Sequence, residues 1–256
     1  MILALDIGNT IVDIGLFQGE EILLRVKLPT RRKSTPEEYF ALLHPYLAPY
    51  KDELEGMILS SVVPSLTASF RKLAEIYLQL EILEVNSCLK TGLRIDYEQP
   101  ERLGADRIAN AVGVASHYSL PAVVVDFGTA ITMEIIDATK TYRGGIILPG
   151  IGISLRSLFQ SASLLEPVEI KSPSSLIGKS TRESILSGIV NGYSALVEGM
   201  VERFEKEIGE KCTLVITGGE GEWIKEGLRR EYHYDPLLTL KGLRIIYEMN
   251  KGGREK

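Results

Sequence analysis

The chain of 256 residues carries 29 lysine or arginine residues against 34 aspartate or glutamate residues, which gives a formal net charge of −5. Two compact domains of ordinary size fit that length. A composition of 45% hydrophobic and 25% charged residues excludes a globally disordered or fibrous chain. The acidic balance argues against a nucleic-acid partner, because phosphate backbones are bound by clustered lysine and arginine.

The cysteines and the apolar segments indicate a cellular setting. Cys88 and Cys212 cannot build a disulfide framework and have no paired metal-ligand spacing. The N-terminal apolar run reaches Asp6 too early for a secretory signal. No apolar run approaches the roughly 18–20 residues that a membrane span requires. We therefore expect a cytoplasmic protein without a membrane partner.

Three strands open the chain, and the Gln18-Gly19-Glu20 turn before the third is typical of an antiparallel hairpin. Thr35-Pro36-Glu37-Glu38 predicts the start of a helix, since a capping residue precedes proline and two acids. The apolar spacing predicts strands over residues 1–6, 11–17, 21–28, 56–62 and 82–85, and helices over 36–47, 64–80 and 102–118.

The same order of elements then begins again. The pattern predicts strands over residues 122–126, 131–136, 143–148 and 214–217, helices over 151–162 and 182–208, and a loop over 163–181. In each half, an Asp-x-Gly turn follows the first strand. The aspartates of the two turns, Asp6 and Asp126, are 120 residues apart. We therefore predict an internal duplication of β-β-β-α units in an α/β fold, with domains at residues 1–118 and 119–256.

The repeated turn carries groups that suit phosphate binding. Asp6 ends an apolar strand and can hold a cation, Gly8 lets the backbone approach an anion, and Asn9 and Thr10 offer short polar side chains. A polar β-turn explains one such segment equally well. The second copy, Asp126-Phe127-Gly128-Thr129, favours a nucleotide site, and two acids near a polyphosphate require a cation.

A third constellation, Gly104-Ala105-Asp106-Arg107, lies at the start of a predicted helix. One interpretation is structural: the helix dipole favours Asp106 and keeps it ionised, and Arg107 forms a surface ion pair. The other makes Asp106 a carboxylate base and Arg107 a donor to an anionic substrate group. These residues alone leave both interpretations open.

Two further patterns carry no chemistry. Gly178-Lys179-Ser180 lacks the first glycine of a phosphate-binding P-loop, because Pro173 stands there. The histidines have no metal-ligand spacing.

The order of six short motifs resembles that of the type III pantothenate kinases, over nearly the whole chain. The motifs are Asp6-Ile7-Gly8-Asn9-Thr10, Tyr97-Glu98-Gln99-Pro100 ahead of Gly104-Ala105-Asp106-Arg107, Asp126-Phe127-Gly128-Thr129-Ala130, Gly144-Gly145-Ile146-Ile147-Leu148-Pro149-Gly150, and Gly178-Lys179-Ser180-Thr181. Lys179-Ser180 departs from the pattern, because a basic residue followed by asparagine or aspartate is more usual there. The resemblance implies two tandem ribonuclease-H-like domains, with mixed sheets flanked by helices, facing each other across a nucleotide cleft.

The resemblance also implies an activity and its site: ATP-dependent phosphorylation of pantothenate to 4'-phosphopantothenate, the first step of coenzyme A biosynthesis, in a homodimer. Asp106 matches the proton acceptor, and Asp126 matches the ligand of a monovalent cation, potassium or ammonium, while magnesium accompanies the nucleotide. The ATP-binding positions are Asp6, Ile7, Gly8, Asn9, Thr10, Ile11, Val12, Asp13 and Thr129. The pantothenate-binding positions are Tyr97, Gly104, Ala105, Asp106, Arg107 and Thr181.

Two alternatives remain at this stage. The type III pantothenate kinases belong to the acetate and sugar kinase, chaperone ATPase and actin superfamily. One alternative is another kinase or phosphohydrolase of that superfamily with a different acceptor, which the set of Tyr97, Asp106 and Arg107 disfavours. The other is a non-catalytic, transcription-accessory type of regulator on the same scaffold. The presence of Asp6, Asp106 and Asp126 together disfavours the regulator, because a protein without catalysis does not need all three acids.

Overall fold

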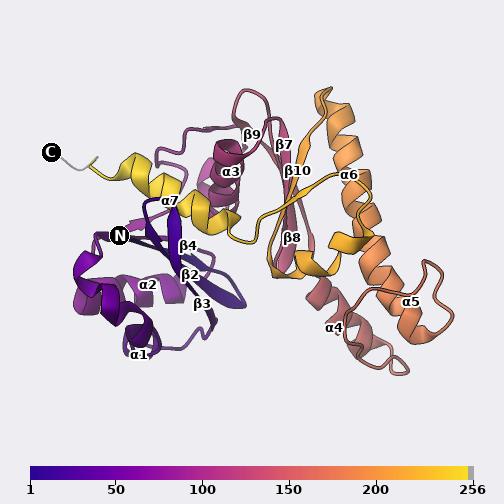
Figure 1. Ribbon diagram of the computed structural model, residues 1–256, viewed down its shortest axis with the longest axis horizontal. Helices are drawn as coiled ribbons and strands as arrows, with labels where there is room; N and C mark the ends of the chain where they lie inside the picture. Colours follow the sequence, from indigo (N-terminus) through magenta and orange to yellow (C-terminus); the bar gives the residue numbers. More distant parts are fainter. Residues whose placement is uncertain (253–256) are drawn as a thin grey trace. The chain divides into compact units, whose positions relative to one another are not determined.

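The computed structural model describes residues 1–252, which form two compact units. The first unit consists of Met1–Ser116 and the C-terminal segment that begins at Leu237, and the second consists of His117–Pro236. Each unit contains a mixed β-sheet with helices beside it, as the predicted α/β fold class requires (Figure 1).

The first sheet has the strand order β3-β2-β1-β4-β5. Its first three strands are antiparallel neighbours, whereas β4 runs parallel to β1 and β5 runs parallel to β4. The strands are β1 (Ile2–Ile7), β2 (Ile11–Gln18), β3 (Glu21–Pro29), β4 (Gly56–Ser61) and β5 (Ile82–Glu84).

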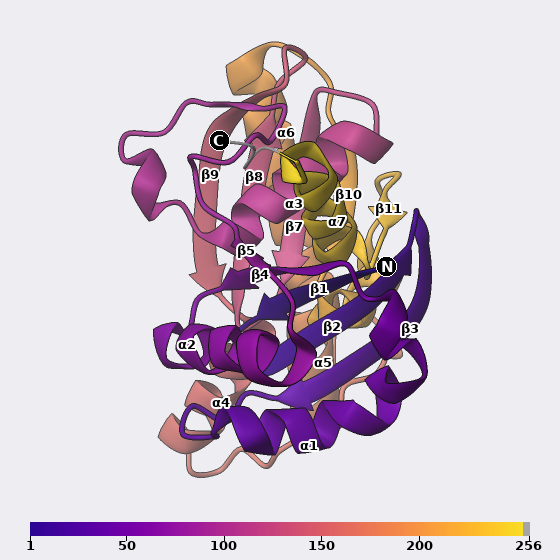
Figure 2. The same cartoon turned by 90° about the vertical axis from the view of Figure 1, so that its left-hand side faces the viewer.

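One face of this sheet holds the first hydrophobic core. Leu3, Leu5 and Ile7 alternate along β1 and pack with buried side chains of α1 (Pro36–Leu47) and α2 (Pro64–Leu73), which lie along the sheet in Figure 2. The predicted start of α1 is confirmed: Thr35 and Glu38 form a reciprocal capping box, and Pro36 is the first helical residue.

The opposite face of the sheet contacts α7 (Leu238–Asn250), which packs on β1, β2 and β4. Two glycines permit the approach: a Cβ on Gly15 would lie 3.2 Å from Leu240, and one on Gly56 would overlap the Tyr247 hydroxyl. α7 also packs against α3 (Ala105–His117), where Gly242 contacts the backbone of Ala109. The predicted domain at residues 119–256 therefore needs correction, because α7 belongs with the first sheet.

The strands of the second unit follow the order β9-β8-β7-β10-β11, with the directions of β3-β2-β1-β4-β5. They are β7 (Ala122–Phe127), β8 (Ala130–Ile136), β9 (Thr141–Pro149), β10 (Thr213–Thr217) and β11 (His233–Tyr234). The matching order confirms the predicted duplication. It also gives Asp6 and Asp126 equivalent positions: Asp6 pairs with Asp13 and Ser60, and Asp126 pairs with Thr132 and Thr217.

The long helix predicted over residues 182–208 is interrupted. It divides into α5 (Thr181–Ser187), a π-helical turn (Gly188–Gly192) and α6 (Tyr193–Ile208). Two glycines in five residues explain the interruption, because glycine weakens the regular helical ladder. The predicted helix over 64–80 also ends in a π-helical turn, Ala74–Leu78, after which Gln79 has a left-handed backbone with φ of 55°.

The helix α4 (Ile151–Ser161) follows β9, and the predicted loop then extends from α4 to Ser180. The remaining elements are short. They are the strand β6 (Arg94–Ile95) and the 3-10 turns Ala48–Glu53, Pro100–Arg102, Gly219–Trp223 and Lys225–Gly227. Within residues 1–252, every helix falls short of the length and apolarity needed to cross a bilayer.

The crossing of α7 and α3 yields a stability prediction with a matched control. Gly242→Ala places a Cβ 1.9 Å from the Ala109 carbonyl oxygen, so the helices must separate. We expect a loss of about 1–3 kcal/mol in the free energy of unfolding. Gly199→Ala in α6 meets no atom within 4 Å, and it should gain about 0.5–1 kcal/mol from helix propensity. Denaturant melts of both variants measure the difference, and equal midpoints would refute the close crossing.

Candidate active site

The first candidate loop is a tight turn between β1 and β2. The Gly8 N–H donates to the Ile11 carbonyl oxygen at 3.0 Å, and the Thr30 hydroxyl donates to the Gly8 carbonyl oxygen at 2.7 Å. Asn9, Thr10 and Ile11 are consequently exposed at the end of the hairpin. The turn thus presents short polar side chains and backbone beyond the carboxyl end of β1.

Not every position predicted to bind ATP offers a side chain. Ile7 and Val12 are fully buried in the first core, so only their backbone remains available. The Asn9 side-chain oxygen accepts a hydrogen bond from Arg32 at 2.8 Å. Arg32 belongs to a basic run, Arg31-Arg32-Lys33, beside the loop.

Asp6 and Asp13 lie directly opposite each other on β1 and β2. The Ser60 hydroxyl, fully buried on β4, donates to Asp6 Oδ1 at 3.0 Å. Arg25 on β3 holds Asp13 with two hydrogen bonds, from Nε to Oδ1 at 3.0 Å and from Nη2 to Oδ2 at 2.6 Å. Sequence reasoning missed Ser60 and Arg25, because only the strand pairing shows that they lie beside the acids.

The second candidate loop joins β7 to β8. The Gly128 N–H donates to the Ala130 carbonyl oxygen at 3.1 Å, and the Gly150 N–H donates to the Thr129 carbonyl oxygen at 3.2 Å. A Cβ on Gly150 would lie 2.4 Å from that same Thr129 oxygen. The glycine at residue 150 therefore allows the end of β9 to contact the loop that carries Thr129.

A glycine allows the turn that follows β10 to approach the Asp126 carboxylate closely. Gly218 has a φ of +84°, and a Cβ there would lie 2.5 Å from Asp126 Oδ1. Across residues 1–252 there is no group of three histidine, cysteine, aspartate or glutamate residues that could hold a metal ion.

The structure brings together the residues of the first unit that were predicted to bind pantothenate. Asp106 is the second residue of α3, and its Oδ1 accepts the Arg107 N–H at 2.8 Å. Arg107 is only 7% exposed, with its guanidinium carbon 5.8 Å from the centre of the Tyr97 ring. The interpretation of Arg107 as a surface ion-pair residue is therefore wrong. A Cβ on Gly104 would lie 2.4 Å from Asp106 Oδ1, so glycine leaves room for that carboxylate.

Asp106 has an unusual affinity for its proton. Burial raises the pKa of its carboxyl above the ordinary value of 3.8, and this effect outweighs the Arg107 N–H and the Arg107 charge, which lower the pKa. The expectation that the helix start keeps Asp106 ionised is therefore opposed by desolvation. A carboxylate with a raised pKa is a stronger proton acceptor.

Thr181, the last predicted pantothenate residue, lies in the second unit. It is exposed at the first position of α5, directly after the N-capping Ser180, whose hydroxyl accepts the Glu183 N–H at 3.2 Å. The Glu183 carboxylate in turn accepts the Ser174 N–H at 3.0 Å. These bonds fix the start of α5 and the position of the threonine.

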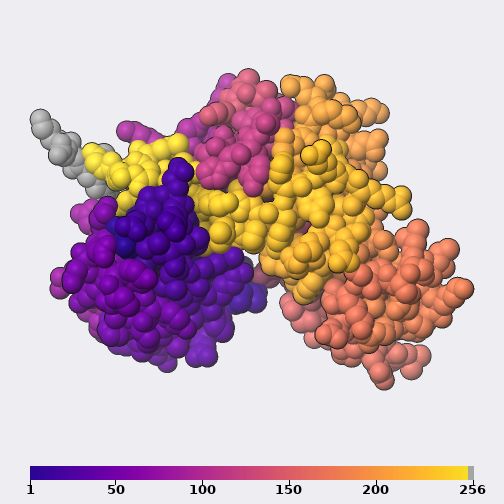
Figure 3. Space-filling view, viewed as in Figure 1, coloured from indigo at the N-terminus to yellow at the C-terminus, as the bar shows by residue number. Residues whose placement is uncertain are grey.

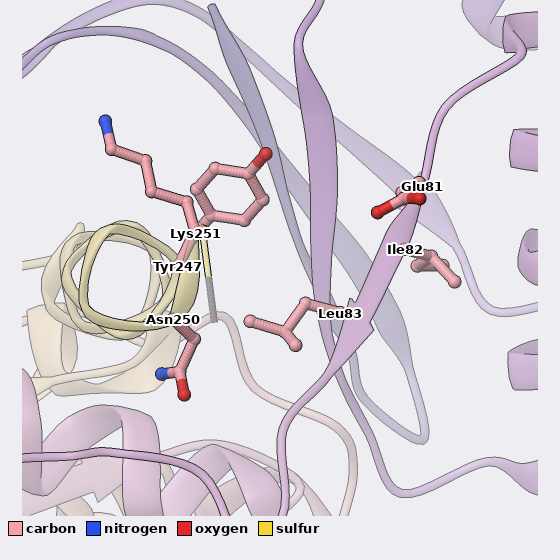
Figure 4. Close-up of a pocket in the computed structure, with 7 residues that line it drawn as sticks. Glu81, Ile82, Leu83, Tyr247, Asn250 and Lys251 are labelled. Carbon is pink, nitrogen blue, oxygen red and sulfur yellow. The ribbon is translucent and has the colours of Figure 1, made fainter. Parts of the chain in front are cut away.

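A cavity of about 250 Å³ lies elsewhere in the first unit, between β5 and the C-terminal end of α7 (Figure 4). Leu83 points from β5 toward α7, which contributes Tyr247 and Asn250. None of the residues predicted to bind ATP, pantothenate or a cation lines it.

Solved structures with a similar fold cover nearly the whole chain. A Baf family transcriptional activator from Campylobacter jejuni aligns with a TM-score of 0.61 at 21% identity, over 97% of this chain and 98% of that one. Component A of the (R)-2-hydroxyglutaryl-CoA dehydratase of Acidaminococcus fermentans aligns with a TM-score of 0.56 at 14% identity, over 99% of both chains. These identities show the fold alone. It consists of two ribonuclease-H-like domains, with mixed sheets flanked by helices.

The sequence comparisons define the family. The family model for type III pantothenate kinase matches residues 2–203. Type III pantothenate kinases from a Roseiflexus species and an Exiguobacterium species are 43% and 41% identical to this chain, each over 98% of the chain and 100% of the relative. The chain belongs to the type III pantothenate kinases. It is a kinase that uses ATP to phosphorylate pantothenate in coenzyme A biosynthesis, and the regulator alternative has no support.

The raised pKa of Asp106 predicts that this acid destabilises the fold. The charged form is disfavoured in the folded state, so the penalty is absent below the ordinary value of 3.8 and complete above the raised pKa. Asp106→Asn should therefore raise the melting midpoint at pH 7, and the gain should shrink as the pH falls toward 4. Thermal melts across that range measure it, and a variant less stable than the wild type at pH 7 would contradict the cause given for the shift.

Proposed function

We propose that the first unit supplies the proton acceptor, Asp106, for transfer of the ATP γ-phosphoryl group to the primary hydroxyl of pantothenate. The observation that carries this proposal is the carboxylate with a raised pKa beside the buried Arg107. Phosphoryl transfer passes through a loose transition state, so it needs an oriented hydroxyl and neutralised charge more than covalent help. Asp106 accepts or orients the hydroxyl proton.

Pantothenate binds through the residues around Asp106 in this proposal. Its carboxylate is the natural partner of the Arg107 guanidinium, which the Tyr97 ring keeps in place from one side. Gly104 and Ala105 border the acid, and Thr181 adds a hydroxyl from the start of α5. In this proposal the guanidinium distinguishes pantothenate, which carries a carboxylate, from a neutral sugar acceptor.

The ATP phosphates bind at the two glycine turns in this proposal. Gly8, Asn9, Thr10 and Ile11 contribute the exposed part of the first turn, with the backbone of Ile7, Val12 and Asp13 and the acid Asp6 behind it. Thr129 contributes the hydroxyl of the second turn. Backbone N–H groups in such turns form an anion-binding concavity without a lysine.

Cations complete the site in this proposal. The Asp126 carboxylate, with backbone of the Gly128 and Gly218 turns around it, would hold potassium or ammonium. Magnesium would arrive with the nucleotide, near Asp6. When bound, these ions supply positive charge to the phosphate oxygens.

We further propose that the enzyme is a homodimer and works in the cytoplasm. Large apolar side chains stay exposed on α4 and on the segment that follows it, shown in salmon and orange in Figure 3: Ile153, Leu158, Leu164, Leu176 and Ile177. A second copy that covered them would remove this apolar surface from water. Sedimentation should give twice the chain mass of 28.3 kDa, and a monomer would exclude the dimer.

The proposed cytoplasmic setting agrees with the state of the cysteines. Cys88 and Cys212 are both free, which suits a reducing compartment.

The assignment of Asp106 predicts a specific loss of turnover. Wild-type enzyme should release ADP only when pantothenate is present, and Asp106→Asn should lower kcat by about 100-fold or more, since general bases contribute that much. The KM for ATP should change little, because the substitution leaves the glycine turns intact. A coupled ADP-release assay measures both constants. Turnover near the wild-type value would remove Asp106 as the proton acceptor.

The assignment of Asp126 predicts a change in cation dependence. The wild-type rate should be higher in potassium or ammonium buffer than in sodium buffer at equal ionic strength. Asp126→Ala removes the only charged ligand proposed for that cation, so the difference between buffers should disappear. Thr132→Ala, one strand away on β8, is the control and should retain the difference. A wild-type rate that is equal in all three buffers would refute the cation site.

A further inference from the structure

Four polar residues form a row across the first sheet. Ser60, Asp6, Asp13 and Lys27 are direct neighbours on β4, β1, β2 and β3, and directly opposed residues point to the same face of a sheet. This face is opposite the core that contains Leu5 and Ile7. The row therefore lies at the carboxyl end of β1, beside the turn to which we assigned the ATP phosphates.

The row places two like charges together. Directly opposed side chains on antiparallel strands have Cβ atoms about 4.5–5.5 Å apart, and like charges at that separation are unfavourable. A triphosphate adds further negative charge. In the proposed site, Asp6 faces the cation that accompanies the nucleotide. Unless its charge is neutralised, the neighbouring Asp13 carboxylate would repel the phosphates.

The duplicated sheet provides an internal comparison. The equivalent row of the second unit reads Thr217, Asp126, Thr132 and Ile147 on β10, β7, β8 and β9. It contains one acid and no base. The row of the first unit has an additional acid, Asp13, which pairs with Lys27 of the row and with Arg25 two residues before it on β3. The formal charges of Asp6, Asp13, Arg25 and Lys27 sum to zero. The additional acid thus comes with its own countercharge.

Arg25 supplies most of that countercharge. It occupies both oxygens of Asp13, at 3.0 and 2.6 Å, and its side chain is 26% exposed. Lys27 Nζ lies 3.9 Å from Asp13 Oδ2, and the lysine is 47% exposed. A bidentate guanidinium at a partly buried carboxylate is a stronger and more directional partner than an exposed ammonium.

We propose that Arg25 is a positioning residue for nucleotide binding: it neutralises Asp13 and holds that carboxylate toward β3. Asp6 then remains as the acid of the row that faces the cation and the phosphates. Arg25 acts through Asp13 and does not itself contact the nucleotide. The inference rests on the proposed ATP site at the first turn.

Steady-state kinetics of the full-length enzyme test this role. Arg25→Met leaves the Asp13 charge without its bidentate partner, so the KM for ATP should rise about tenfold, which corresponds to about 1.4 kcal/mol of repulsion, while kcat stays within about twofold. The double variant Asp13→Asn, Arg25→Met removes both charges and should recover most of the increase. Arg25→Lys keeps the charge without the fork and should give an intermediate KM.

Arg71→Met is the matched control, because Arg71 forms an equally direct pair with Glu84 on the same unit. It should leave the KM for ATP unchanged, and thermal melts of all variants detect loss of folding. An unchanged KM in a folded Arg25→Met variant overturns the proposal. A double variant as weak as Arg25→Met also overturns it, since Arg25 would then contact the nucleotide directly. Titration of a fluorescent ATP analogue separates these outcomes from failure of the proposed function, because it reports nucleotide binding even if no pantothenate is phosphorylated.

Discussion

The two-residue period of a β-strand is the constraint on which this enzyme depends. In β1 it directs Leu3, Leu5 and Ile7 into the core and therefore directs Asp6 to the other face, at the carboxyl end of the strand. The same period puts Asp126 at the equivalent place in β7. A carboxylate is thus presented beyond a sheet that is rigid because its opposite face is packed.

That constraint also explains why the supporting residues come from distant parts of the chain. Ser60 contacts Asp6 because β4 pairs with β1, and Gly218 approaches Asp126 because β10 pairs with β7. In each unit the acid belongs to one strand and its surroundings belong to the neighbouring parallel strand. A mixed sheet therefore converts a local Asp-x-Gly turn into a site with several partners.

The residues proposed to bind pantothenate depend on burial rather than on strand pairing. Asp106 and Arg107 begin α3, yet desolvation raises the pKa of the acid and Arg107 is covered by its surroundings. The helix dipole favours an ionised Asp106, and burial opposes it. A carboxylate whose pKa burial raises accepts a proton more readily than an exposed aspartate does.

The amino-acid sequence by itself determined the elements, the duplication and the candidate acids of this pantothenate kinase. Apolar periodicity and capping residues are local signals, so α1, the hairpins and the repeated turn were all predictable. Only the tertiary structure decided that α7 packs on the first sheet, that Arg107 is buried, and that Arg25 and Ser60 accompany Asp13 and Asp6. Those facts depend on contacts between segments that are distant in the sequence. Arg25 and Asp13 are 12 residues apart, and Ser60 and Asp6 are 54 residues apart. Local sequence patterns carry no information about such pairing, because it is determined by which surfaces bury each other when the whole chain folds.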